Sequence, residues 1–345
     1  MPLQAIGQHI GTGIIKLFSL HSSSSNKEIL LRGDAELPSC PLISILIPAY
    51  RRTNYLGRLL DSLDLQNFRN FEVIVTDDTE GDEVKAFVAA RTQQFPLTYV
   101  KNEQPKGTPL NWTAGLPYAK GEWIKIIHDD DWLSNANALQ SFYDATHTKP
   151  DCIFSGYYAF YEADQSKQDK TITQTQFKRI LRHPYLLFAN NIIGPPSVLM
   201  FHRSMQALYD PSLKWLVDLE GYVRMMKRYQ CVYISEPLIF MSYNATQVTN
   251  DCFRNPEVEI PEALVFYQKF GADAYRHVVT YDAWWRLLRN LSIRDQQTLQ
   301  RYAKGADIPK FLNKMLSFQQ KIPASLLRIG IFSKCFMFIC FLTRR

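Results

Sequence analysis

The 345-residue sequence lacks the patterns that mark several common classes of protein. Its six cysteines are scattered and none are spaced C-x-x-C, which argues against a zinc site or a thioredoxin-type motif. No G-x-G-x-x-G follows an apolar run, so a dinucleotide-binding dehydrogenase is disfavoured. No stretch of the sequence contains the run of about 18 uninterrupted apolar residues that a membrane-spanning helix needs. The simplest interpretation of the scattered thiols is that they are reduced, in a cytoplasmic compartment.

Acidic residues are scarce in only one part of the chain. The sequence has 39 Lys and Arg against 33 Asp and Glu, a formal net charge of +6. Residues 301–345 hold nine of the basic residues and one acid, Asp307, and so carry +8. The remaining residues carry 30 basic and 32 acidic side chains, or −2. Because the basic residues are concentrated in the C-terminal tail, we do not expect the rest of the chain to bind nucleic acid. The tail itself would be attracted to an anionic surface.

What the sequence does contain, from residue 41 onward, is an alternation of apolar runs with helical patterns. Such an alternation predicts an α/β, doubly wound sheet, and continuous apolar runs suit strands that are buried on both faces. A helix capped by Asn54 is expected to bury a stripe of leucines. The expected strands are 42–48, 71–76, 97–101, 123–128 and 197–202. The other expected helices are 83–94, 109–119 and 212–229, with 258–320 mostly helical.

Polar residues cluster where three of these strands end. They are Tyr50 to Arg52, Asp77-Asp78, and Asp129-Asp130-Asp131. In doubly wound sheets, ligands bind beyond the carboxyl ends of the strands. Three consecutive carboxylates repel one another, and Mg²⁺ or Mn²⁺, which prefer hard oxygen ligands and often bridge to phosphates, would offset that repulsion. A solvated acidic turn or a helix N-cap is the alternative interpretation of each acidic group.

Four segments between Pro41 and Leu133 together resemble the nucleotide-sugar-binding half of family 2 glycosyltransferases. They are Ile47–Tyr50, Val73–Asp78, the run Asn102…Gly107…Asn111…Gly115…Ala119-Gly121, and Asp129-Asp130-Asp131-Trp132-Leu133. The resemblance implies a GT-A-type doubly wound mixed sheet flanked by helices, with a C-terminal helical extension. We therefore expect an N-terminal extension or linker over 1–40, a GT-A-like domain over 41–250, a helical extension over 251–325 and a basic amphipathic tail over 326–345.

The resemblance also assigns roles to residues. Asp77 would contact the base of the donor, with Asp78 nearby, and Asp130 would face the ribose or the donor sugar. The residues assigned to nucleotide-sugar binding are Pro48, Ala49, Tyr50, Arg52, Asp77, Asp78, Gly107, Asn111, Asp129 and Asp130. The implied metal ligands for Mg²⁺ or Mn²⁺ are Asp131 and Asp129. Asp218 is the implied catalytic base, with Glu220 in reserve, and Gly194-Pro195-Pro196-Ser197 resembles a loop near the acceptor.

Two departures from the family pattern bear on these roles. The usual Asp-Asp-Gly-Ser is Asp-Asp-Thr-Glu at 77–80, which stiffens the turn after Asp78. His128 occupies a place where many relatives have an acid or a small residue, and an ordinary strand-end histidine is the favoured interpretation. A separate observation concerns the product. The Gln-x-x-Arg-Trp signature of processive synthases is absent from the sequence, which favours addition of a single sugar.

The resemblance therefore predicts a metal-dependent, inverting glycosyltransferase. It would move one sugar from a nucleoside-diphosphate sugar to a hydroxyl of a glycan or lipid-linked acceptor, in cell-surface polysaccharide synthesis, in the cytoplasm or peripherally at the cytoplasmic face of the membrane. Two alternatives stay open. One is a sugar nucleotidyltransferase, although the loop after the first strand contains no glycine. The other is a non-catalytic carbohydrate- or membrane-binding protein on a decayed transferase fold.

The C-terminal segment 326–342 is apolar, interrupted by Arg328, Ser333 and Lys334, and followed by Arg344 and Arg345. A segment of this kind can lie in the membrane interface with its apolar side down. The alternative is a terminal helix docked on the core of the protein.

Overall fold

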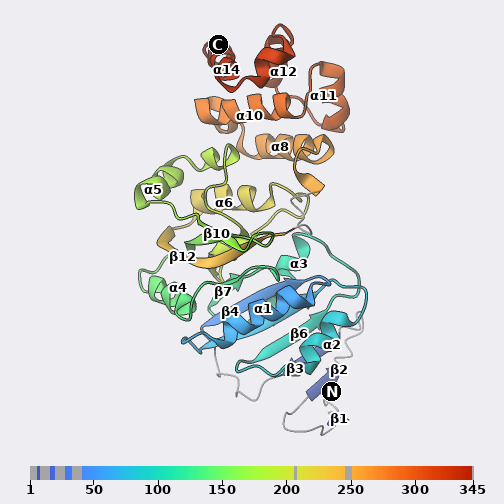
Figure 1. Ribbon diagram of the computed structural model, residues 1–345, viewed down its shortest axis with the longest axis vertical. Coiled ribbons are helices and arrows are strands. Elements are labelled where there is room, and N and C mark those ends of the chain that lie inside the picture. Colours follow the sequence, from blue (N-terminus) through green and yellow to red (C-terminus); the bar gives the residue numbers. More distant parts are fainter. Residues whose placement is uncertain are drawn as a thin grey trace. The chain divides into compact units, whose positions relative to one another are not determined.

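The computed structural model describes residues 41–205, 208–244 and 251–343, together with three short strands nearer the N-terminus (Figure 1). The residues cluster into two compact units. The first unit contains the described residues up to 177 together with 193–211 and 228–244, and the second contains 178–192, 212–227 and the described residues beyond 250. The predicted domain boundaries at 40, 250 and 325 stay predictions. The contacts divide the chain differently, because 178–192 and 212–227 group with the C-terminal helices.

The first unit is built on one mixed sheet, in which the described strands number 12. The order is β1-β2-β3-β6-β5-β4-β7-β11-β9-β12-β8, and β10 pairs with β9. Strands β4 to β7 form a parallel core in the order β6-β5-β4-β7. The strands are β1 (Ile6–Gly7), β2 (Lys16–Ser19), β3 (Glu28–Arg32), β4 (Ile43–Ala49), β5 (Phe71–Asp77), β6 (Leu97–Lys101), β7 (Trp123–Ile126), β8 (Trp132–Leu133), β9 (Cys152–Tyr161), β10 (Ser166–Asp169), β11 (Leu199–His202) and β12 (Cys231–Tyr243).

Every residue of β4 and of β5 is buried, which confirms the expectation of strands covered on both faces. The mixed half of the sheet lies beyond β7, where β11 runs antiparallel to both β7 and β9, and β12 runs parallel to β9. The sequence predicted β11 but neither β9 nor β12. The fold class is as expected, a mixed α/β sheet of the GT-A type flanked by helices, with a helical C-terminal region.

The helices of the first unit follow the alternation with some differences in extent. They are α1 (Thr53–Asp64), α2 (Glu83–Ala90), α3 (Leu110–Thr113) and α4 (Ala138–Thr146), with 3-10 turns η1 (Leu116–Tyr118) and η3 (Pro196–Val198). Helix α1 buries Leu56, Leu59, Leu60 and Leu63, as its pattern predicts. The capping role predicted for Asn54 is wrong, because α1 begins at Thr53 and Arg52 precedes it without a side-chain cap.

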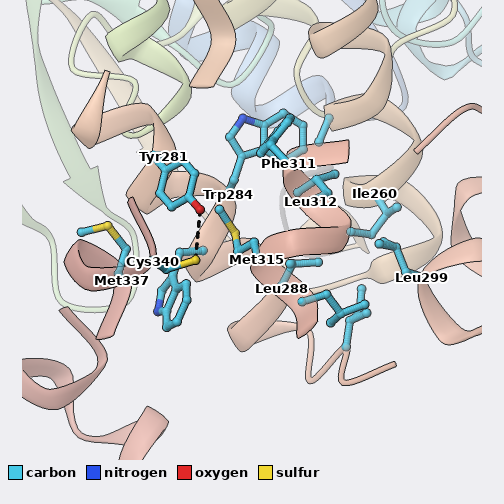
Figure 2. Close-up of a cluster of buried hydrophobic side chains, with 14 of the residues drawn as sticks. Ile260, Tyr281, Trp284, Leu288, Leu299, Phe311, Leu312, Met315, Met337 and Cys340 are labelled. Carbon is cyan, nitrogen blue, oxygen red and sulfur yellow. Dashed lines mark hydrogen bonds between the residues drawn. The ribbon is translucent and has the colours of Figure 1, made fainter. Parts of the chain in front are cut away.

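The second unit is helical and has its own core. Its elements are η2 (Pro184–Phe188), α6 (Val217–Arg228), α8 (Pro256–Phe270), α9 (Asp273–Arg276), α10 (Val278–Asn290), α11 (Gln296–Ala303), α12 (Lys310–Gln320), α13 (Ala324–Arg328) and α14 (Gly330–Leu342), while α5 (Gln174–Arg182) begins in the first unit. The buried cluster includes Trp284, Leu288, Phe311, Leu312 and Met315 (Figure 2). Across the described residues, no helix combines the length and apolarity needed to cross a bilayer.

Gly121 gives a test of the parallel core. A Cβ atom at this position would lie 2.5 Å from the backbone nitrogen of Ser44, on β4. Since that atom is backbone and cannot rotate away, we expect Gly121→Ala to lower the free energy of unfolding by about 3 kcal/mol. The control is Gly330→Ala, where an added Cβ meets nothing within 4 Å beyond its chain neighbours and its own helix. Chemical denaturation of both variants measures the difference, and equal midpoints would contradict the close approach.

Candidate functional site

The carboxyl ends of three parallel strands meet at one edge of the first unit. Ala49 at the end of β4 pairs with Asp77 at the end of β5, and the N–H of Asp78 donates to the carbonyl of Ala49 over 3.0 Å. The N–H of Tyr50 donates to Oδ2 of Asp129, in the loop that follows β7, over 3.1 Å. The structure therefore places the three polar clusters that the sequence singles out at a common edge of the sheet.

Arg52 joins two members of the acidic triplet. Its guanidinium donates to Oδ2 of Asp130 over 2.7 Å and to Oδ1 of Asp129. Asp129 is almost fully buried, and this burial raises the pKa of its carboxyl to about 7 although Arg52 acts in the opposite direction. Arg52 thus offsets part of the cost of burying neighbouring carboxylates.

Asp131 is held by the mixed half of the sheet. The hydroxyl of Ser197, in η3, donates to its Oδ2 over 2.5 Å, and the N–H of Ser242, on β12, donates to its Oδ1 over 3.2 Å. Burial raises the pKa of Asp131 well above its usual range, and the neighbouring Asp130 adds to this. A buried carboxylate in this position is the arrangement that a bound divalent cation would stabilise.

A buried lysine holds the segment that contains Ser197 in place. Lys125, on β7, is fully buried and donates through Nζ to the carbonyl of Ser197 over 2.5 Å. Burial lowers its pKa well below the usual range of a lysine, and Nζ lies 4.1 Å from the centroid of the Phe142 ring. The loop 194–197, which the resemblance places near the acceptor, therefore also fixes Asp131. The sequence gives no local signal for the role of Lys125.

The donor set of a metal site forms at the turn that follows β7. His128, Asp130 and Asp131 each offer one ligand atom, and the three atoms lie within 4.8 Å of one another. The turn itself brings them together, since the N–H of Asp131 donates to the carbonyl of His128 over 3.0 Å. An imidazole with two carboxylates fits Mn²⁺, which accepts nitrogen as well as oxygen ligands.

His128 fits this set better than the sequence indicates. Its Nε2 is buried and no hydrogen-bond partner accounts for it among the described residues. Burial lowers the pKa of His128 to about 4, so the ring is neutral at pH 7, the form that binds metals. Its ring packs on Trp112 with centroids 4.7 Å apart. The predicted ligand Asp131 belongs to the set, whereas Asp129 contacts Tyr50 and Arg52, and its role as a ligand stays a prediction.

Asp77 lies fully buried at the end of β5. The hydroxyl of Tyr99 donates to its Oδ2 over 2.7 Å, Lys101 Nζ lies 3.2 Å from the same oxygen, and the N–H of Thr79 donates to Oδ1 over 2.7 Å. Each oxygen of a carboxylate can accept more than one hydrogen bond. Asp77 has no exposed surface in the structure, however, and its contact with a base stays a prediction. The sequence analysis did not identify Tyr99 and Lys101 as partners of Asp77. Lys101 on β6 pairs directly with Asp77 on β5.

Asp78 organises the loop that carries the glycine and asparagine of the family pattern. Asn102 Nδ2 donates to Oδ1 of Asp78 over 2.7 Å, and the N–H of Gly107 donates to Oδ2 over 2.7 Å. Gly107 has a φ of +67°, which favours glycine. Asn111 accepts from Asn102 over 2.9 Å and directs its own Nδ2 at the carbonyls of Ala49 and Thr76. Their contacts shape the edge of the site, and their donor-binding roles stay predictions.

The proposed base belongs to the second unit and is described with it. Asp218 lies in the first turn of α6, where it accepts from Asn191 Nδ2 over 2.9 Å and from the N–H of Leu219 over 2.7 Å. Burial raises the pKa of Asp218 to about 6. The reserve candidate, Glu220, is fully buried between Arg224 at 2.9 Å and Lys269 at 3.0 Å. These two ion pairs favour a structural role for Glu220.

A cavity of about 600 Å³ lies elsewhere in the first unit. It is lined by Leu42 and Trp123, at the amino ends of β4 and β7, and by His202 at the end of β11. The acidic triplet follows the opposite end of β7, so this cavity is not part of the site described above.

A parallel sheet core in a mixed sheet, with carboxylates gathered at the strand ends around a candidate cation site, is an arrangement of the GT-A type. Residues 44–209 match the family described as glycosyl transferase family 2. Residues 44–209, which contain the acidic triplet described above, belong to this family and form a glycosyltransferase region.

Its relatives fit this assignment. An uncharacterized glycosyltransferase of Haemophilus influenzae is 24% identical over 208 residues, which cover 59% of this chain and 69% of the relative. The candidate colanic acid biosynthesis glycosyl transferase WcaA of Escherichia coli is 26% identical, over 77% of this chain and 98% of its own. Among solved structures, S. aureus TarS 1–349 in complex with UDP-GlcNAc superposes with a TM-score of 0.59 at 15% identity, covering 86% of this chain and 89% of that one.

A second solved structure is the mannosyltransferase PcManGT from Pyrobaculum calidifontis, in complex with GDP-Man and Mn²⁺. It superposes with a TM-score of 0.51 at 13% identity, over 90% of this chain and 89% of that one. At these identities the two structures support the fold.

Proposed function

We propose that this enzyme is a metal-dependent, inverting transferase. It adds a single sugar from a nucleoside-diphosphate sugar to a hydroxyl of a glycan or lipid-linked acceptor, in the synthesis of a cell-surface polysaccharide. The observation that carries the proposal is the group of His128, Asp130 and Asp131 at the carboxyl edge of the sheet. The kinship with WcaA supports the polysaccharide assignment. The reaction would take place in the cytoplasm or at the cytoplasmic face of the membrane.

The donor would lie along the ends of β4 and β5. Pro48, Ala49 and Tyr50 would line the nucleoside pocket, and Tyr50 is 44% exposed, so its ring is available to a base. Asp77 would accept from the base. Arg52, which now pairs with two carboxylates, could redirect its guanidinium to the diphosphate, since planar donors suit phosphate oxygens. UDP-GlcNAc in TarS and GDP-Man in PcManGT are the classes of donor that this proposal extends to the present chain.

The cation would be held by His128, Asp130 and Asp131, with Mn²⁺ or Mg²⁺ as the candidates. When bound, it would neutralise negative charge on the departing diphosphate. The residues of the chain supply the remaining steps. Asp218 takes the proton of the acceptor hydroxyl as that oxygen attacks the anomeric carbon. The new C–O bond forms as the bond from the anomeric carbon to the phosphate oxygen breaks, and the nucleoside diphosphate leaves with the electron pair, so the configuration inverts.

A thermal-shift panel of nucleotide sugars tests the donor class. A ligand that binds only the folded state raises the unfolding temperature. We expect one nucleoside-diphosphate sugar, with Mn²⁺ present, to raise the midpoint more than the sugar or Mn²⁺ alone. The product of the reaction then separates the alternatives. A glycosyltransferase releases nucleoside diphosphate, whereas a sugar nucleotidyltransferase releases pyrophosphate as it forms the nucleotide sugar. Absence of any shift or product across the panel would instead favour a non-catalytic binding protein.

The pKa of Asp218 predicts a pH dependence. Burial raises this pKa to about 6, and the base acts only when it is ionised. The rate should therefore level off above about pH 7, be half-maximal near pH 6 and fall about tenfold per pH unit well below it. The measurement is kcat/KM across the acid range with saturating metal. An acid limb near pH 4, the ordinary range of an aspartate, would contradict the assignment of a perturbed base.

A further inference from the structure

The last helix presents an apolar face that nothing in the described chain covers. On α14, Ile331 is 70% exposed and Leu342 is 60% exposed, while Phe332, Phe338 and Ile339 are each about half exposed. At the 3.6 residues per turn of an α-helix, these five side chains fall within an arc of about 120°. A contiguous exposed apolar face of this kind marks an interaction site in a folded protein.

This face is held in place by the opposite side of the same helix. Ser333, Met337 and Cys340 are buried in the core of the second unit. Cys340 Sγ lies 3.1 Å from the hydroxyl of Tyr281, and a dashed line marks this contact in Figure 2. Trp285 Nε1 donates to the hydroxyl of Ser333 over 3.0 Å. Both partners lie on α10, so α14 is packed on one side and apolar on the other. The two interpretations of this segment, docked helix and interfacial helix, are therefore compatible.

The charge around this face selects the kind of partner. Lys334, about 40° beyond the edge of the apolar arc, is exposed, as are Arg328 and Lys321 nearby in the chain. Residues 301–345 together carry +8. A second copy of the chain would bring two such tails together and would be repelled, whereas a surface of anionic phospholipid attracts them.

We infer that α14 is an interfacial membrane anchor. Its outer face, defined by Ile331, Phe332, Phe338, Ile339 and Leu342, enters the headgroup and acyl boundary of an anionic bilayer, and the surrounding Lys and Arg side chains contact the lipid headgroups. This inference stands on the C-terminal helix alone and does not depend on the donor, the metal or the acceptor.

Vesicle flotation of the full chain tests the anchor. We expect the wild type to float with phosphatidylcholine vesicles that contain phosphatidylglycerol, and to float less at high salt or with phosphatidylcholine alone. The double variant I331S/F338S should lower the partition coefficient more than about tenfold, because two apolar side chains are lost. Lys334→Gln should lower it about fivefold.

The matched control is Leu65→Ser, which removes an apolar side chain that is 69% exposed in the first unit. This variant should float like the wild type. The unfolding temperature of every variant is measured beside its flotation, because Phe338 is only half exposed and its ring stacks on that of Phe341. Equal flotation of the wild type and I331S/F338S would overturn the inference. So would a wild-type dimer, seen by sedimentation without lipid, that I331S/F338S converts to a monomer, because a second copy would then cover the face.

Discussion

Asp131→Asn should lower metal-dependent turnover by about 10³-fold or more. Asp131 belongs to the group that can hold a cation, and the substitution keeps its size while removing its negative charge. Loss of a single preorganised electrostatic contact costs about 10² to 10³ in kcat, and a ligand to the cation should cost at least the upper figure. The amide can still pair with the hydroxyl of Ser197 and the N–H of Ser242, so the fold should persist.

The measurement is the initial rate of nucleoside diphosphate release across a titration of Mn²⁺. The control is Asp144→Asn, an exposed carboxylate on α4 that accepts a hydrogen bond from Gln140 on the same helix. This control should retain the wild-type rate. If Asp131→Asn turned over at the wild-type rate with the same Mn²⁺ dependence, Asp131 would have no part in holding the cation.

Asp218→Asn should lower turnover by about 10² to 10⁴-fold, the usual contribution of a general base. Donor affinity should change little, because the residues assigned to the donor all lie in the first unit and Asp218 lies in the second. The acid limb of the pH profile should vanish with the base. Rapid-mix kinetics for turnover, with calorimetry for the dissociation constant of the donor, measure the two effects separately.

Glu220→Gln separates the two candidate bases. Glu220 pairs with Arg224 and Lys269, so its loss should lower the unfolding temperature while the rate constant per folded molecule stays close to the wild type. The opposite pattern, with Glu220→Gln inactive and Asp218→Asn active, would transfer the role of base to Glu220.

The parallel core was predictable from the sequence because its strands are buried on both faces. Every residue of β4 and β5 is shielded, and continuous apolar runs report that condition directly. The mixed half was not predictable from local pattern. Strand β12 alternates buried and exposed positions irregularly and carries a register shift around Pro237, so neither a period of two nor a continuous run appears in its sequence.

The candidate site, like the fold, has one part that the sequence predicts and another that only the structure shows. The acidic triplet was visible because three carboxylates follow a strand, and the predicted ligand Asp131 lies in the donor set. The contacts that hold it come from far along the chain, with Ser197 66 residues away and Ser242 111 residues away, and no local sequence signal carries such contacts. The buried Nε2 of His128, which has no hydrogen-bond partner among the described residues, likewise depends on tertiary burial and is apparent only in the structure.

The most direct test of the cation site is a titration of the wild type and Asp131→Asn with Mn²⁺, followed by electron paramagnetic resonance in the presence of nucleoside diphosphate. Wild-type protein should bind one Mn²⁺ per chain, more tightly with the nucleotide than without it, and Asp131→Asn should lose that ion. If the wild type bound no Mn²⁺ under these conditions, or if both proteins bound it equally, His128, Asp130 and Asp131 would not form the metal site on which the proposed chemistry rests.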